Sequence, residues 1–131
     1  MNSLSQKISP CFNLAARVLM ALIFVVAGYG KMGAYAGTQG FMQSLGIPGS
    51  LLPLVILVEV GGGLALILGL QTRLAAFLLA GFTLLAGTIV HFHPNDQQSM
   101  IVFMDNLAIA GGLLLFVQYG GGRFALDRLR K

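Results

Sequence analysis

Five residues that can ionise or form hydrogen bonds interrupt the long apolar stretches of this 131-residue chain. They are Lys31, Glu59, His91, Asp105 and Asn106. Glu59 lies inside an apolar run, where an unpaired charge in lipid costs roughly 2.5–3.5 kcal/mol. Polar side chains that converge from neighbouring helices are typical of a ligand-binding site in a helical bundle. We therefore treat all five as candidate ligand-binding residues, and a purely structural polar core is the alternative.

The expected partner of Glu59 is Lys31, whose long side chain can reach inward from the end of the first apolar run. Arg17 falls within about 40° of Lys31 around a helix, because residues advance by about 100° each. Phe24 and Gly28 share that face. This stripe predicts that Arg17 is a structural polar residue facing the bundle. The alternative is that both cations extend to the membrane surfaces.

Asp105 and Asn106 cannot both face the bundle axis, since adjacent helical residues point about 100° apart. We expect Asn106 to face inward and to hydrogen-bond the Lys31–Glu59 pair. Asp105 would then face a neighbouring helix or a shallow wet pocket, unless its helix begins later and leaves it at the membrane surface. His91 is expected to form a hydrogen bond at the outer mouth of the bundle.

A metal site is the obvious alternative role for His91 and His93, which lie near Asp96 and two methionines. Their spacing matches no strong ligand motif, and methionine is an ordinary packing residue in such helices. Cys11 is the only cysteine, so this chain alone offers no disulfide, Cys-x-x-Cys pair or cysteine-based metal site. We expect no metal ligands, no covalently bound cofactor, and a buried Cys11.

The composition indicates that these residues sit in a chain surrounded by lipid. Hydrophobic residues make up 56% of the sequence and charged residues only 9%, against about 25% charged in soluble domains. Much of the net charge of +4 comes from the C-terminal tail, which holds Arg123, Arg128, Arg130 and Lys131. A basic, aromatic-rich soluble surface is absent, which argues against nucleic acid as a partner. The lipid bilayer is the predicted environment.

Four apolar runs each approach the ~20 residues that a helix needs to cross the hydrocarbon core. They cover residues 12–32, 50–70, 72–91 and 99–119. The first connection is long enough for a short interfacial helix over 38–45, with Phe41, Met42 and Leu45 on one side, or for a mobile loop. The predicted fold is an all-α membrane protein, an up-and-down bundle of four transmembrane helices forming a single domain, 1–131.

The positive charges predict the orientation of the bundle. Lys7, Arg17, Arg73 and the basic tail fall on one side of a four-span protein, so the positive-inside rule places both termini in the cytoplasm. The first run is longer than the apolar region of a signal peptide and is interrupted by charge. We therefore expect it to be a membrane span.

Four stretches together follow a familiar pattern. They are RVLMALIFVVAGYGK from Arg17, YAGTQGFMQSLGIP from Tyr35, PLVILVEVGGGLALILGLQTR from Pro53 and NLAIAGGLL from Asn106. In them the chain resembles the DoxX family of small bacterial inner-membrane proteins, and within it the branch of the inner membrane protein YqjF. The resemblance implies four helices, with Arg and Lys in the first, Glu in the second and Asn in the fourth. Asp105 departs from that pattern, in which Lys often precedes the Asn.

The resemblance also implies an association with membrane oxidoreductases, including a thiosulfate:quinone oxidoreductase. The chain itself has no cysteine pair, strong haem-ligand pattern or dinucleotide fingerprint. We therefore predict an accessory subunit of a membrane redox system that binds a quinone-like or other small amphipathic molecule in the outer half of the bundle. Lys31 and Asn106 would hydrogen-bond its carbonyls, and Glu59 or His91 would relay protons.

Two other functions are compatible with the sequence. One is a non-enzymatic assembly or interaction subunit, in which the polar residues only set the register of the helices. The weaker one is a small transporter acting as an oligomer, since the inner half offers few polar residues besides Arg17. The protein partner stays open between a second copy of the chain and a membrane redox protein.

Overall fold

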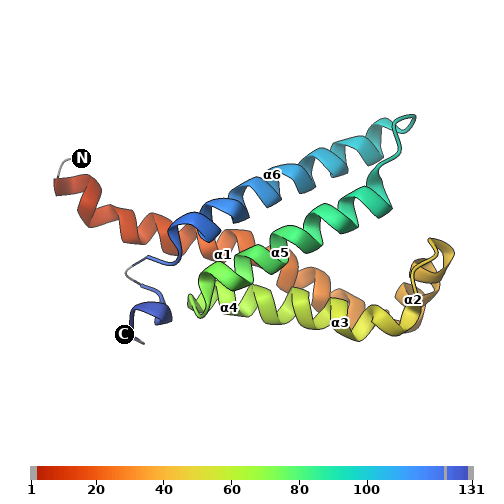
Figure 1. Ribbon diagram of the computed structural model, residues 1–131, viewed down its shortest axis with the longest axis horizontal. Coiled ribbons are helices and arrows are strands. Elements are labelled where there is room, and N and C mark those ends of the chain that lie inside the picture. The colour runs from red at the N-terminus through yellow and green to blue at the C-terminus, as the bar shows by residue number, and fades with distance from the viewer. Residues whose placement is uncertain (1–2, 123, 130–131) are drawn as a thin grey trace.

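The computed structural model describes residues 3–122 and 124–129, and the regular elements within them are all helical (Figure 1). Helix α1 spans Ser3–Gly33 and α2 spans Tyr35–Ser44. The next span is built from η1 (Gly49–Leu51), α3 (Leu52–Ile56), η2 (Leu57–Gly61) and α4 (Gly62–Leu68). Then come α5 (Thr72–Ala86), η3 (Gly87–His91), α6 (Gln97–Tyr119) and the short η4 (Leu126–Leu129).

Four helical segments are long and apolar enough to cross a membrane, which confirms the predicted fold class. They are Ser9–Gly33, Gly49–Leu68, Thr72–His91 and Gln97–Tyr119. The third agrees with the predicted run at both ends. The fourth begins two residues early, because the carboxylate of Asp96 caps the helix by accepting a hydrogen bond from the amide of Gln98.

The spans pack as two adjoining pairs. Helix α1 lies along η2 and α4, and α5 lies along α6, while α4 and α5 join the pairs through a short turn. In Figure 1 the pairs lie close together near the two chain termini and diverge toward α2. We call these the terminal end and the α2 end of the bundle. Cys11 is exposed, contrary to expectation, because it lies about 200° around α1 from Asn13, which faces the C-terminal segment.

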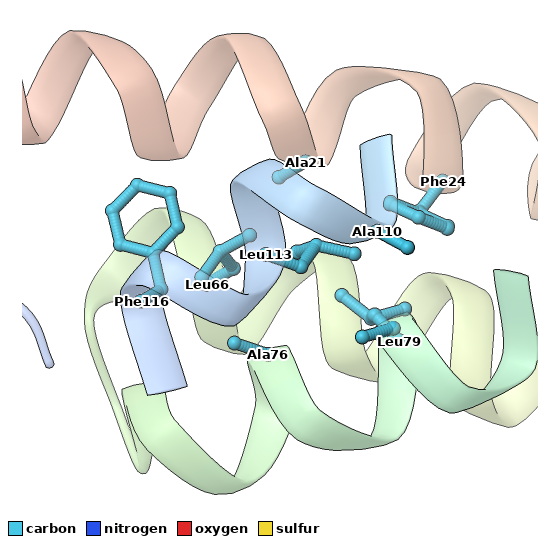
Figure 2. Close-up of a cluster of buried hydrophobic side chains, with 9 residues drawn as sticks. Ala21, Phe24, Leu66, Ala76, Leu79, Ala110, Leu113 and Phe116 are labelled. Carbon is cyan, nitrogen blue, oxygen red and sulfur yellow. The ribbon is translucent and has the colours of Figure 1, made fainter. Parts of the chain in front are cut away.

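The hydrophobic core lies where the two pairs meet. Figure 2 shows side chains from all four spans converging there: Ala21 and Phe24 of α1, Leu66 of α4, Ala76 and Leu79 of α5, and Ala110, Leu113 and Phe116 of α6. The alanines allow the helix backbones to approach closely, which drives helix association in lipid more than burial of apolar area does. Beyond this core the helices present apolar side chains outward, as a lipid environment requires.

The first connection contains the predicted short helix. Helix α2 begins three residues earlier than expected, at Tyr35, and lies beside the start of the second span. The side-chain amide of Gln39 donates to the backbone carbonyl of Gly49 at 3.1 Å. Met42 is buried and Leu45 half-buried, whereas Phe41 is 53% exposed, so the expected apolar side contains only two of its three residues.

Candidate functional site

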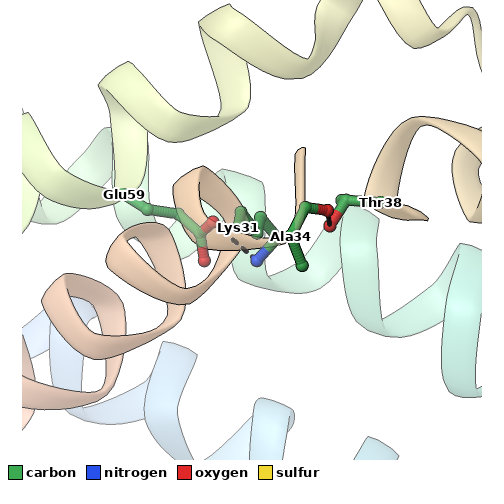
Figure 3. A network of polar contacts seen from close by, with 4 residues as sticks. All are labelled: Lys31, Ala34, Thr38 and Glu59. Carbon is green, nitrogen blue, oxygen red and sulfur yellow. Dashed lines mark hydrogen bonds and ion pairs between the residues drawn. The ribbon is translucent and has the colours of Figure 1, made fainter. Parts of the chain in front are cut away.

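The most polar buried contact at the α2 end is an ion pair between α1 and η2. The ammonium of Lys31 lies 2.7 Å from Oε1 of Glu59, as predicted (Figure 3). The Glu59 side chain is 5% exposed and that of Lys31 29% exposed. A buried carboxylate without a cation would be strongly unfavourable in this apolar span. The pair therefore explains how the chain accommodates an acid there.

Close packing of α1 against η2 brings the two charges together. Glu59 lies at the centre of η2, a π-helical segment within the second span. A Cβ on Gly28 would lie 2.5 Å from Cγ2 of Val60 and 3.3 Å from Cβ of Glu59, so a larger residue would force Val60 or the helices to shift. π-helical turns inside α-helices are rare and occur frequently at functional sites, where the extra residue redirects a side chain.

The geometry leaves the ammonium with unused hydrogen-bonding capacity. A lysine ammonium has three N–H donors, and in the described residues its polar contact is the carboxylate of Glu59. Lys31 lies in the last turn of α1, next to the junction with α2, where the Thr38 hydroxyl donates to the Ala34 carbonyl at 2.8 Å (Figure 3). The Lys31 side chain is partly exposed, so its ammonium has N–H donors to spare while it stays paired with Glu59.

Asn106 does not join this pair, which corrects the predicted cluster. Its amide donates to the carbonyl of Thr83 at 3.5 Å, and its side chain packs against Gly87. The hydroxyl of Thr83 donates in turn to the carbonyl of Leu79 at 2.7 Å. Asn106 thus faces α5 within the other helix pair, where it links α5 to α6.

Asp105 is exposed on α6 and has no polar partner among the described residues. Asp105 does not face a neighbouring helix, contrary to expectation. Asn106 points toward α5, and the Asp105 side chain points about 100° away from it around α6. From the start of α6 at Gln97, Asp105 lies about 12 Å along the helix. It belongs to the outward surface of the bundle and not to a pocket shared with Glu59.

His91 also lies apart from the ion pair, at the end of η3. It is half-buried, and its ring has no hydrogen-bond partner in the described residues, contrary to expectation. The ring of His93 instead contacts the carbonyl of Val90 at 3.0 Å. In the described part of the chain no three His, Cys, Asp or Glu side chains are grouped so as to hold a metal ion.

Asp96 acts as a helix cap in this loop. The Ser99 hydroxyl donates to its carboxylate at 2.9 Å. That hydrogen bond is the main reason why the pKa of Asp96 lies below its usual value.

The five candidates therefore divide between the two diverging helix pairs. Lys31 and Glu59 form one unit between α1 and η2, while Asn106 and His91 belong to the α5–α6 pair and Asp105 faces outward. A single pocket lined by all five does not form in this structure.

Comparisons with known proteins identify the chain at the level of its family. The DoxX family model matches residues 12–92. The chain belongs to the DoxX family. It is 48% identical over 116 residues to the inner membrane protein YqjF of Escherichia coli K12, covering 88% of this chain and 89% of that protein. It is 38% identical over 127 residues to the inner membrane protein YphA of the same organism, covering 91% and 90%.

A more distant relative carries a functional name. The protein named "Putative oxidoreductase CatD" of Bacillus subtilis 168 is 34% identical over 102 residues, covering 74% of this chain and 75% of that protein. No solved structure matches the chain at a significant level. With its four spans, this DoxX-family chain is a multi-pass inner-membrane protein.

Arg17 of this DoxX-family chain faces the bundle, as its stripe predicts, and is fully buried at the terminal end. Its guanidinium donates to the carbonyls of Leu66 at 3.1 Å, Ile67 at 2.8 Å and Phe124 at 2.9 Å. Nε donates to Oδ1 of Asn13 at 2.9 Å. Arg17 thus satisfies carbonyls at the end of α4 and binds the C-terminal segment to the bundle.

Sequence reasoning missed two residues of this terminal network. Oδ1 of Asn13 also accepts from the amide of Gly122 at 2.9 Å. The carboxylate of Asp127 accepts from the amides of Gln71 at 2.7 Å and Thr72 at 2.9 Å, and so caps the start of α5. Asn13 lies one helical turn before Arg17, which was a usable signal. Asp127 is more than fifty residues from its partners, and nothing in its local sequence indicates them.

Proposed function

We propose that this DoxX-family chain is an accessory membrane subunit of a redox system and holds the polar head of a quinone-like molecule at the Lys31–Glu59 pair. The observation that carries the proposal is the asymmetry of the pair: the Glu59 side chain is buried, whereas the Lys31 side chain is partly exposed and its ammonium keeps free N–H donors. The relative CatD supports a connection with redox chemistry by its name alone.

The chemistry of the pair suits a neutral quinone head group better than a ligand with a permanent charge. A quinone is amphipathic and neutral, and each of its carbonyls can accept a hydrogen bond from an ammonium. The adjacent carboxylate, 2.7 Å away, is a base that can exchange a proton with Lys31. Asn106 is no longer proposed to hydrogen-bond a quinone carbonyl, and His91 is no longer proposed to relay protons, because both belong to the other helix pair.

Binding of a short-chain ubiquinone to the purified protein in lipid nanodiscs tests the proposal. We expect Lys31→Gln to weaken binding at least tenfold, since one charge-assisted hydrogen bond contributes roughly 1.5–3 kcal/mol. Asp105→Asn is the matched control, because it removes a charge from the same half of the bundle without touching the pair. It should bind ubiquinone like the wild type.

The charge exchange Lys31→Glu with Glu59→Lys provides the second variant if Lys31→Gln does not fold. It restores an ion pair but buries the ammonium in η2, so it should fold and still fail to bind ubiquinone. Absence of ubiquinone binding by the wild type, or equal binding by the wild type and both pair variants, would overturn the proposal. Equal binding with altered stability would favour the assembly subunit, in which the pair only sets helix register.

A further inference from the structure

A second polar feature lies at the terminal end, away from the ion pair. A cavity of about 360 Å³ opens there between the α4–α5 turn, the end of α6 and the C-terminal segment. Its lining residues are Gln71, Thr72, Arg73, Tyr119, Gly120, Gly121 and Asp127. Three membrane spans end or begin around it, at Leu68, Thr72 and Tyr119. The cavity therefore sits at the level of the lipid head groups.

The side chain of Arg73 lies beside the backbone of Gly120 at this cavity. Gly120 has a φ of +71°, which favours glycine, and a Cβ there would lie 3.0 Å from Nε of Arg73. The side chain of Arg73 thus lies across Gly120. Its guanidinium is exposed and has no hydrogen bond or ion pair in the described residues.

The acid in the lining does not neutralise this guanidinium. Both carboxylate oxygens of Asp127 accept backbone amides at the start of α5, and Asp127 also interacts electrostatically with Arg17. The cavity wall also contains Thr72, which is fully buried and whose hydroxyl has no hydrogen-bond partner among the described residues. The cavity thus combines a free cation, an unsatisfied hydroxyl and the exposed phenol of Tyr119.

We infer that this cavity binds the phosphate of an anionic phospholipid. Guanidinium groups bind phosphate through two parallel hydrogen bonds, and basic pockets between transmembrane helices recognise lipid head groups. Phospholipid phosphates are concentrated at this depth. Tyrosine is also typical of the membrane interface, where its ring stays in the apolar region and its hydroxyl in the polar one.

Native mass spectrometry of the full chain, released from nanodiscs that contain phosphatidylglycerol and phosphatidylcholine in equal amounts, tests the inference. We expect phosphatidylglycerol to be retained preferentially by the wild type. Arg73→Gln should reduce that preference about five- to tenfold, as expected for one basic side chain at the membrane surface. Lys7→Gln is the matched control, since it removes one positive charge from the first turns of α1 and not from the α4–α5 turn.

Arg73→Lys separates the effect of the guanidinium geometry from that of the charge. It is also the replacement variant if Arg73→Gln is unstable. It keeps the positive charge but loses the planar fork, so it should retain part of the preference. Equal retention of the two lipids by the wild type, or equal losses in Arg73→Gln and Lys7→Gln, would overturn the inference. In a competition experiment, inorganic phosphate or glycerol 3-phosphate is added to the lipid-bound protein. Displacement of the lipid by either at low millimolar concentration would assign the cavity to a free phosphate and also overturn it.

Discussion

At the residue scale, the central question is how the chain tolerates charge inside apolar spans. Glu59 and Arg17 are both buried, but their environments differ. Glu59 is neutralised by one neighbouring cation, Lys31, which is itself partly exposed. Arg17 is surrounded by backbone carbonyls and an asparagine oxygen. The first arrangement leaves N–H donors of the ammonium without a partner in the described residues, whereas the second uses four of the five guanidinium N–H donors within the protein.

The asymmetric exposure of the pair predicts unequal effects of removing each partner. Lys31→Gln leaves a 5% exposed carboxylate without its cation and should cost about 3–5 kcal/mol of unfolding free energy. Glu59→Gln leaves an ammonium that can extend toward water, so the loss should be smaller, about 1–2 kcal/mol. The double change Lys31→Met with Glu59→Leu should recover most of the stability.

Thermal unfolding in detergent, monitored by circular dichroism, measures the relative stabilities of the wild type and these variants. Asp105→Asn again serves as the control and should unfold within a few degrees of the wild type, since it breaks no described contact. Equal destabilisation by Lys31→Gln and Glu59→Gln would contradict the asymmetry argued from the exposures.

At the element scale, the approach of α1 to η2 determines whether the pair can form at all. Gly28→Ala would place a methyl group 2.5 Å from Val60 Cγ2, and either the helices separate or the valine moves. We expect a loss of about 1–3 kcal/mol, as for other overpacked contacts. Gly30→Ala, on the same helix with nothing within 4 Å, should be neutral or stabilising by up to about 1 kcal/mol.

Denaturant titration of the two glycine variants in detergent tests this packing. Gly28→Ala should also weaken ubiquinone binding, because Glu59 moves with η2. A Gly28→Ala variant as stable as Gly30→Ala would mean that α1 and η2 do not approach as closely as the structure indicates.

The elements themselves were predictable, because span length and hydropathy depend on local sequence. Residues 72–91 were predicted correctly, and the stripe of Arg17 and Lys31 correctly placed both inside the bundle. The predicted convergence of Asn106 with Glu59 failed, since the angle between the two helix pairs follows from packing between distant residues. The π-helical turns in η2 and η3 also redirect side chains in a way that a regular 3.6-residue period cannot predict.

At the scale of the whole molecule, the two ends of the bundle differ in their polar contacts. The helix pairs diverge toward the α2 end (Figure 1), where the side chain of Lys31 is partly exposed and that of Glu59 is buried. At the terminal end, Arg17 and Asp127 bind the C-terminal segment to the end of α4 and the start of α5. The terminal end is therefore tied by hydrogen bonds that join the C-terminal segment to α1 and α5 and join α1 to α4, whereas the main polar contact at the α2 end is a single ion pair.

The terminal network predicts a local effect of Asp127→Asn. The asparagine side chain has one oxygen, so it cannot accept from the backbone amides of both Gln71 and Thr72 as the carboxylate does. The cap of α5 should therefore weaken by about 1 kcal/mol. Hydrogen–deuterium exchange should therefore rise at those two amides and around Gly69, whose carbonyl accepts from the Asp127 amide at 2.9 Å. Asp96→Asn is the matched control, because Asp96 caps α6 on the other side of the bundle. Asp96→Asn should raise exchange near Gln98 and leave exchange at the α4–α5 turn unchanged. If Asp127→Asn leaves exchange at that turn unaltered, the C-terminal segment does not tie this end of the bundle.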